Sequence, residues 1–125
     1  MTNKNDMITA LDGLADAFNA HDIDKIMTYF DNDCSLDMPR GPEPHGSRYT
    51  GLDNVRRGLL TRFQTTPDVH YGELKHFIDG NTDISKWLLT GTTPGGKEIK
   101  VRGCDFYTFR GGKIIGKDSY WKIVE

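Results

Sequence analysis

The stretch from residue 69 onwards constrains the fold most, because polar turn signals divide it into strand-like runs of similar length. The turn signals DGNTD, TPGGK and RGG occupy residues 79–83, 93–97 and 110–112. They separate four runs, which read VHYGELKHFI, ISKWLLTGTT, EIKVRGCDFYTF and KIIGKDSYWKIV. Clusters of Gly, Asp, Asn and Pro between β-prone runs are typical of hairpin turns, and such short connections join antiparallel neighbours. Residues 69–124 are therefore predicted to form an antiparallel meander.

Three amphipathic helices are predicted upstream of the meander. Apolar residues recur at helical spacing in three groups, namely Ile8, Leu11, Ala15 and Phe18, then Ile23, Ile26, Met27 and Phe30, and later Leu52, Val55, Leu59 and Phe63. Asp22 suits the N-cap of the second helix, and a short strand at residues 34–38 follows that helix. The segment RGPEPHGSRYTG comes next, and its Gly and Pro residues predict an irregular loop. Helices followed by a meander, without a repeat or a linker, predict one α+β domain over residues 1–125.

Size and charge limit the possible partners. The chain has 125 residues, enough for one domain, and 16 basic against 18 acidic residues give it a net charge of -2. Neither sign of charge is clustered, so we expect no nucleic-acid partner and no membrane-surface binding. The charged N-terminus does not suit a signal peptide, and no apolar run could span a bilayer, so a soluble, cytoplasmic protein with a small-molecule ligand is predicted. Cys34 and Cys104 are expected to be free thiols.

One acidic residue interrupts the apolar side of the third strand-like run. Alternate positions of this run place Asp105 on the same side as Ile99, Val101, Tyr107 and Phe109. A carboxylate in apolar surroundings loses hydration, so its pKa is expected to rise and the neutral acid could donate a hydrogen bond. Alternatively, Asp105 bonds a backbone amide and only organises the sheet. Buried carboxylates are costly and cluster at functional sites, which makes Asp105 the first candidate catalytic residue.

The order of the elements resembles the NTF2-like superfamily, and within it the SnoaL-like and ketosteroid isomerase-like branch. The segments that carry the resemblance are HDIDKIMTYFDNDCSLDMP, GPEPHG, CDFYTFRGGKI and SYWKIV, and together the match covers nearly the whole chain. The resemblance implies a cone in which N-terminal helices pack on a strongly curved antiparallel β-sheet and enclose an apolar pocket. Proteins of this shape differ in their chemistry, so no segment indicates one particular reaction.

The resemblance also implies roles for single residues. Asp105 matches the acid that helps to hold an oxyanion in ketosteroid isomerase. The base of that enzyme corresponds to Met38 here, and its helix-1 tyrosine falls at about Leu14, so ketosteroid isomerisation is not expected. His45, in the loop expected near the pocket mouth, is the candidate for a replacement base, and the alternative is a plain surface histidine.

Further residues are expected around a bound ligand. Trp121 is the predicted apolar wall of the pocket, and Ser119 shares its side of the last strand and could donate a hydrogen bond. The other expected lining residues are Tyr107, Met38, Phe30 and Trp87. Asp37 and Asp118 should point outward by strand alternation, and Arg102 should lie on the opposite face from Asp105 unless Gly103 forms a bulge.

Neither a metal nor another cofactor is predicted. His70 and His76 would share a strand face but lie too far apart to hold one ion, and no CxxC, HExxH or phosphate-loop pattern occurs. Two hypotheses remain for the function. The first is a cofactor-free acid–base enzyme, an isomerase, cyclase, dehydratase or hydrolase acting on a small, largely apolar molecule. The second is a non-catalytic ligand-binding or dimerisation domain.

The outer face of the predicted sheet combines apolar rings with charges, which is unusual for a solvated surface. Its members are Arg102, Cys104, Phe106 and Tyr120. We therefore expect a two-fold homodimer through this face, as in proteins of similar fold.

Overall fold

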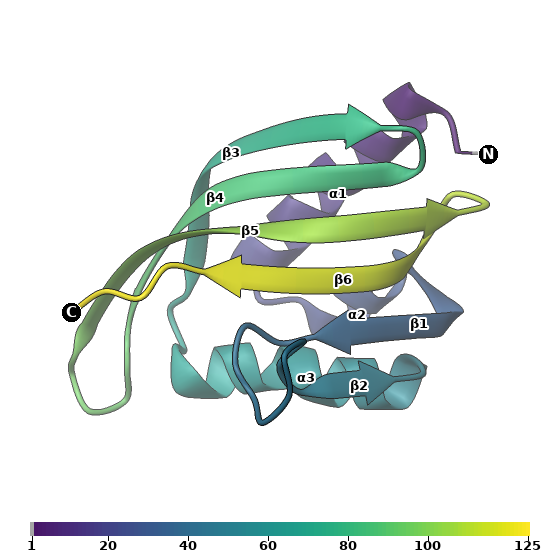
Figure 1. Ribbon diagram of the computed structural model, residues 1–125. Coiled ribbons are helices and arrows are strands. Elements are labelled where there is room, and N and C mark those ends of the chain that lie inside the picture. The colour runs from purple at the N-terminus through teal and green to yellow at the C-terminus, as the bar shows by residue number, and fades with distance from the viewer. Residues whose placement is uncertain (1) are drawn as a thin grey trace.

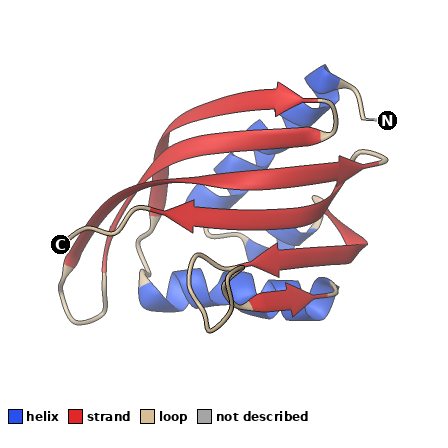
Figure 2. Cartoon of the chain, in the orientation of Figure 1, coloured by secondary structure: helices blue, strands red, loops and turns tan. Residues whose placement is uncertain are grey.

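The computed structural model describes residues 2–125. Six strands form one sheet in the order β2-β1-β6-β5-β4-β3 (Figure 1). In chain order the elements are α1 (Lys4–Asn19), α2 (Ile23–Met27), β1 (Phe30–Asp37), β2 (Arg48–Thr50), α3 (Leu52–Thr65), β3 (His70–Asp79), β4 (Thr82–Thr92), β5 (Glu98–Arg110) and β6 (Lys113–Trp121). The helices lie on one side of the curved sheet and leave its other face uncovered (Figure 2). The predicted α+β architecture is confirmed.

The predicted meander is confirmed, but the sheet is not antiparallel throughout. Strands β3 to β6 pair with their neighbours in antiparallel order. β1, in contrast, runs parallel to β6, with Leu36 opposite Lys117 and Asp37 opposite Asp118. A parallel pair needs a long crossover connection, and here the whole segment from β2 to β5 supplies it. The last strand therefore lies inside the sheet, where β1 covers its free edge.

The loop predicted to be irregular contains a short strand. β2 pairs antiparallel with β1, with Leu36 opposite Tyr49. The loop before β2 closes through a bond from the Met38 amide to the Ser47 carbonyl, 2.9 Å long. Gly46 has a φ of +81°, and a Cβ at this position would lie 2.1 Å from the Met38 carbonyl oxygen. Only glycine fits that turn, which agrees with the loop predicted from the sequence. The sequence did not indicate the short strand β2 that follows the turn.

Two helix predictions need correction. The second helix ends at Met27, and Phe30 begins β1 instead of extending the helix. The chain turns there because the Ile114 amide donates to the Tyr29 carbonyl, which brings β1 alongside β6. In α1, Leu11 and Phe18 are buried as predicted, but Met7, Leu14 and Ala17 complete the buried stripe in place of Ile8 and Ala15.

A bulge in β3 reverses the side to which its later residues point. The register with β4 shifts between Gly72 and Lys75, and Glu73 has a φ of +51°. Tyr71 and His76, five residues apart, consequently both face the helices. The prediction that His70 and His76 share a strand face is therefore wrong, because a bulge adds one residue to the alternation.

The hydrophobic core lies between the helices and the inner face of the sheet. Its main cluster joins α1, α2 and α3 to β1, β5 and β6, and a smaller cluster contains Val69, Trp87, Leu89 and Val101. Among residues 2–125, no helix is long and apolar enough to cross a membrane.

Candidate acid–base site

Asp105 lies on the inner face of β5 and is 4% exposed. Its Oδ2 is 2.9 Å from the Lys117 ammonium and accepts a 2.9 Å hydrogen bond from Trp87 Nε1. Its Oδ1 accepts a 2.5 Å bond from the Ser119 hydroxyl. The Lys117 ammonium also donates to the Tyr107 hydroxyl at 2.8 Å. Asp105 is thus the centre of a buried polar network.

Strand register assembles this network. Asp105 lies between Ser85 on β4 and Ser119 on β6, its neighbours across the sheet. Tyr107, two residues along β5, is paired with Lys117 on β6. No register shift occurs at Gly103, so Arg102 stays on the outer face, where it contacts Glu73 at 3.5 Å. A single antiparallel pair of strands therefore supplies the acid, the cation and two hydroxyl groups.

The surroundings of Asp105 differ from the apolar ones that the sequence predicted. Four donors point at the carboxylate, the most distant being the Tyr107 hydroxyl at 3.5 Å, and one of them, Lys117, carries a full charge. Asp105 is the acceptor in these contacts, whereas the sequence predicted that it would donate a hydrogen bond from apolar surroundings. A role of Asp105 as a hydrogen-bond donor stays a prediction.

Lys117 is a candidate site residue that was not predicted from the sequence. It is 7% exposed, and its pKa is lowered by burial, although the neighbouring Asp105 carboxylate opposes that shift. An ammonium with a lowered pKa releases its proton more readily than an ordinary lysine. The signal was present in the sequence, because Lys117 has the same strand parity as Ser119 and Trp121.

Burial also changes the two tyrosines beside the pair. It raises the pKa of Tyr107 well above the ordinary value, and the Asp105 carboxylate adds to that shift. Burial likewise raises the pKa of Tyr71, against the effect of the Arg62 guanidinium. Both hydroxyls therefore stay neutral at physiological pH and serve as hydrogen-bond donors or acceptors.

Two small cavities flank the Asp105–Lys117 pair. Both are lined by this pair together with Phe18, Tyr71 and Trp87. The first cavity opens between α1 and β3, beside His76 and Ser85. The second lies between β1, α3 and β6 and is lined among others by Met38, Pro39, Leu59, Arg62, Ser119 and Trp121. Each has a volume of about 20 Å³, room for a water molecule or two, so the larger apolar pocket implied by the resemblance is not open in this structure.

A second acidic cluster borders the first cavity. The Asp83 side chain is fully buried and accepts a hydrogen bond from the Ser85 hydroxyl. His76 lies 2.7 Å from the same hydroxyl through Nδ1 and 3.2 Å from Asp12 through Nε2. The other Asp83 oxygen, Oδ1, has no hydrogen-bond partner and lies 3.8 Å from His76 Nδ1. Burial raises the pKa of Asp83.

Two hydrogen-bond patterns satisfy this cluster with the same number of protons. In the first, a protonated Asp83 donates to Ser85, Ser85 donates to Nδ1 of neutral His76, and Nε2–H donates to Asp12. In the second, His76 is an imidazolium that donates at both nitrogens, and Ser85 donates to ionised Asp83. The Ser85 hydroxyl can therefore pass one proton between a buried acid and a histidine near the surface.

The structure does not bring all the predicted site residues together. Trp121, Ser119, Tyr107, Met38 and Trp87 each line at least one of the two cavities. Phe30 is buried in the main core cluster and lines neither cavity.

His45 also lies outside both cavities. It is exposed on the turn before β2 and lines neither cavity. It lies near Asp37, whose pKa is lowered chiefly by the bond from Arg48 and slightly by His45 itself. Among residues 2–125, His45 is therefore not placed beside Asp105 by either cavity, and its role as a base stays a prediction.

Asp118 lies opposite Phe106 on the outer side, as predicted, and burial raises its pKa. Within the described residues, no group of three His, Cys, Asp or Glu side chains is arranged to hold a metal ion.

Fold and site together define an NTF2-like α+β protein with a buried acid–base pair. The SnoaL-like domain family matches residues 11–116, and the chain belongs to this family. Its sequence matches none of the curated proteins with which it was compared.

Solved structures of similar fold agree with this assignment. A protein from Xanthomonas campestris pv. campestris, provisionally assigned as a polyketide cyclase, superposes with a TM-score of 0.84 at 17% identity, covering 97% of this chain and 93% of that one. TerC, co-crystallised with polyporic acid, gives 0.78 at 16% identity over 92% and 90% of the two chains. An isomerase candidate from Bacillus subtilis gives 0.83 at 16% identity over 98% and 90%. The TM-scores establish a common fold, whereas identities this low leave the reaction open.

Proposed function

We propose that this protein is a cofactor-free acid–base enzyme that acts on a small molecule bound beside Asp105. The observation that carries the proposal is the buried pair itself, with Lys117 Nζ 2.9 Å from Asp105 Oδ2 and both side chains at most 7% exposed. Moving two charges out of water costs free energy. A buried ion pair therefore rarely stabilises a protein more than well-packed apolar residues of similar volume would. A charged pair retained beside two cavities is better explained by chemistry than by stability.

The geometry supports a proton transfer at carbon next to a carbonyl group. Asp105 would accept the proton from carbon, and the substrate would become an enolate. Lys117, with its lowered pKa, would stabilise the enolate oxygen or give it a proton, and the proton on Asp105 would return at the end of an isomerisation or cyclisation. Ser119 and Trp87 hold the carboxylate in place through their hydrogen bonds. The provisional cyclase and isomerase assignments of two structures of similar fold are consistent with this class of reaction.

The test is proton exchange on a simple carbon acid. Benzoylacetone in D₂O exchanges its central protons for deuterium, and the rate is followed by NMR. We expect the protein to accelerate exchange and Asp105→Asn to reduce the acceleration about 10²- to 10⁴-fold, as removal of a general base does. Asp118→Asn on the outer side of β6 is the matched control and should keep the rate. Equal rates in the parent and Asp105→Asn would remove Asp105 from the mechanism.

A non-catalytic binding domain remains the second candidate function. The observation that favours it is the small size of the two cavities, each about 20 Å³. A binding domain would take up benzoylacetone, as shown by quenching of tryptophan fluorescence, without accelerating the exchange of its protons. The two measurements on the same sample separate the two functions.

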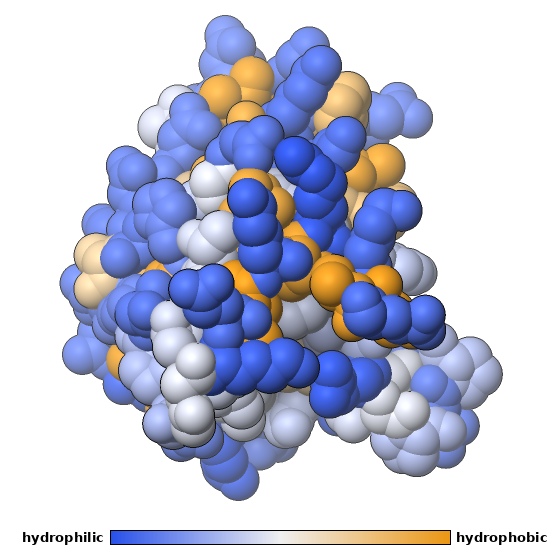
Figure 3. Space-filling model, turned by 90° about the vertical axis from the view of Figure 1, so that its left-hand side faces the viewer, coloured by the Kyte–Doolittle hydropathy of each residue, from blue (hydrophilic) through white to orange (hydrophobic). Residues whose placement is uncertain are grey.

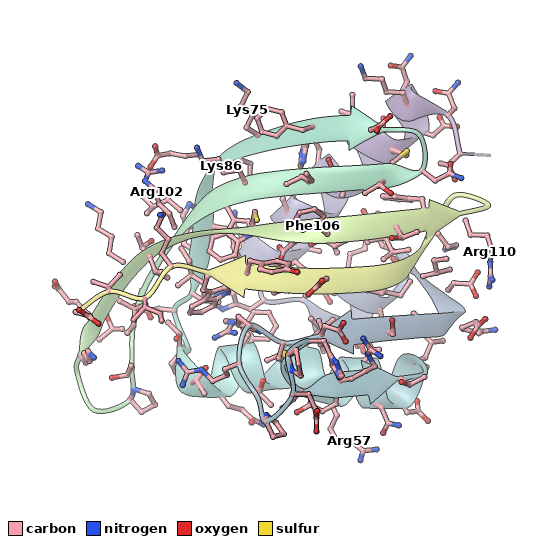
Figure 4. The ribbon with its side chains drawn as sticks, in the orientation of Figure 1. Arg57, Lys75, Lys86, Arg102, Phe106 and Arg110 are labelled. Carbon is pink, nitrogen blue, oxygen red and sulfur yellow. The ribbon has the colours of Figure 1, made fainter. Side chains whose placement is uncertain are left out.

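The homodimer through the outer face of the sheet is part of the same proposal. Phe106 and Tyr120 are 38% and 54% exposed there, and their rings meet edge to face with centroids 5.4 Å apart. Figure 4 shows Phe106 on the uncovered face of the sheet. Exposed aromatic pairs on an open sheet are typical of an interface. Sedimentation should show a dimer at micromolar concentration and a monomer after Phe106→Glu, and a monomeric parent would count against the proposal.

A further inference from the structure

Arg62, in the last turn of α3, is the partly buried cation beside the second cavity. Its guanidinium carbon lies 4.2 Å from the centroid of the Trp121 ring. Within residues 2–125, no carboxylate oxygen lies within 4 Å of its nitrogens, whereas four other arginines form ion pairs, namely Arg48, Arg56, Arg102 and Arg110. Arg40 and Arg57 are exposed to water. Arg62 is thus the arginine that is partly desolvated without an anionic partner.

The charges around the second cavity do not balance. Its charged lining residues are Arg62, Lys117 and Asp105, which give one excess positive charge. Lys117 is already paired with Asp105. Tyr71, which faces Arg62, cannot compensate because its pKa is raised by burial and its hydroxyl stays neutral. The cavity therefore lacks one negative charge.

The Arg62 guanidinium lies over the Trp121 ring and beside the neutral Tyr71 hydroxyl. A guanidinium has five N–H donors in a planar fork, so further donors can meet the two oxygens of a carboxylate or of an ionised β-dicarbonyl group. Figure 3 views the end of the molecule at which α3 and β6 finish, and hydrophobic atoms are visible there among hydrophilic side chains. Arg62 and Trp121 are both partly exposed, so the second cavity combines a cation with an aromatic wall near the surface.

We propose that this cavity binds a planar, conjugated oxyanion, such as an aromatic carboxylate or an ionised β-dicarbonyl compound. The ring of the ligand would take the place of the guanidinium on Trp121, and Arg62 would turn to meet the oxyanion. The small volume of the cavity requires this movement, and the long side chain at the end of a helix permits it. The inference rests on the proposed function only where it places the ligand beside Asp105.

The test compares two probes of equal size, 2-naphthoate and 2-naphthamide, at neutral pH. Dissociation constants are measured by quenching of tryptophan fluorescence. Hydrogen bonds to a charged group favour the anion, so we expect the parent to bind naphthoate about tenfold or more tightly than the amide. Arg62→Gln should remove most of that preference and leave amide binding within about threefold. Arg62→Lys, which keeps the charge, should retain part of it.

Arg57→Gln is the matched control. Arg57 lies on the same helix as Arg62 and is exposed on the side away from the cavity (Figure 4). Its replacement by Gln removes the same charge. It should leave the preference for naphthoate unchanged. An equal loss in Arg57→Gln and Arg62→Gln would show a general charge effect and overturn the inference. Equal affinity of the parent for both probes, or no binding of either at millimolar concentration, would overturn it as well.

Failure of the inference and failure of the proposed function can be told apart. A protein that prefers naphthoate through Arg62 but does not accelerate exchange of benzoylacetone would keep the oxyanion site and lose the acid–base function. A protein that accelerates exchange through Asp105 without preferring naphthoate would keep the acid–base function and lose the oxyanion site.

Discussion

The two buried carboxylates on the inner face of the sheet differ in how they are satisfied. Asp105 has a cation at 2.9 Å and accepts hydrogen bonds from Trp87 and Ser119. Asp83 has a histidine at 3.8 Å, one hydroxyl donor and an oxygen without a partner. The first is held in fixed geometry by a cation and hydrogen-bond donors, whereas the second can exchange its proton with His76. The difference is consistent with the proposal that Asp105 is placed for chemistry, whereas Asp83 is a buried acid that can share a proton with His76.

The largest effect should come from Lys117→Met. The substitution leaves the Asp105 charge buried without its cation, which typically costs about 3–5 kcal/mol. Urea denaturation should show a free energy of unfolding lower by that amount. Adding Asp105→Asn to this variant should restore much of the loss, because no unpaired charge then remains. If the double variant is as unstable as the sum of its singles, the pair is not coupled.

Asp105→Asn alone should cost less than Lys117→Met. It leaves the Lys117 ammonium buried, but this group already has a lowered pKa and can lose its proton to become neutral. We expect a loss of about 1–3 kcal/mol in the same denaturation experiment. A loss equal to that of Lys117→Met would mean that lysine cannot relieve its burial in this way, and the comparison of the two partners would fail.

Asp83→Asn should stabilise the protein at neutral pH. Burial raises the pKa of Asp83 above its ordinary value of 3.8, so the folded state binds this proton more tightly than the unfolded state does. Its contribution is therefore favourable below about pH 3.8 and is lost as the pH rises through the folded-state value. Asn does not titrate, so the variant should gain about 1 kcal/mol at pH 7 and progressively less toward low pH. A gain that grows on acidification would contradict the assignment.

The smallest effect should follow Asp12→Asn. The Asp12 side chain is 66% exposed, and ion pairs at such positions contribute about 0–1 kcal/mol. Thermal denaturation should hardly change, whereas the NMR signals of the His76 ring should shift because its contact with the Asp12 carboxylate is lost. Unchanged ring signals would show that Asp12 does not contact His76 in solution.

Strand alternation was sufficient to predict much of the inner face. The turn signals gave the meander, and the same parity places Asp105, Tyr107, Ser119 and Trp121 on one side of the sheet. The same side also contains Lys117, which could have been found by extending the alternation two residues back from Ser119. The nature of the surroundings of Asp105 could not be predicted, because it depends on which residues lie opposite across two strands.

Other features had no local signal in the sequence. The bulge at Glu73 turns His76 inward although a positive φ at a glutamate is rare, so simple alternation gives the wrong side. The parallel pairing of β1 with β6 joins segments far apart in the chain. The second acidic cluster depends on both the bulge and the contact with α1, and both arise only in the folded protein.

The difference between the two carboxylates can be tested directly by measuring deuterium exchange of benzoylacetone with two isosteric variants. The account predicts that Asp105→Asn loses the acceleration, by about 10²-fold or more, while Asp83→Asn stays within about tenfold of the parent. Both variants remove one buried carboxylate and keep its volume, so packing is matched. Retained acceleration in Asp105→Asn together with its loss in Asp83→Asn would contradict the account and move the acid–base site to the other carboxylate.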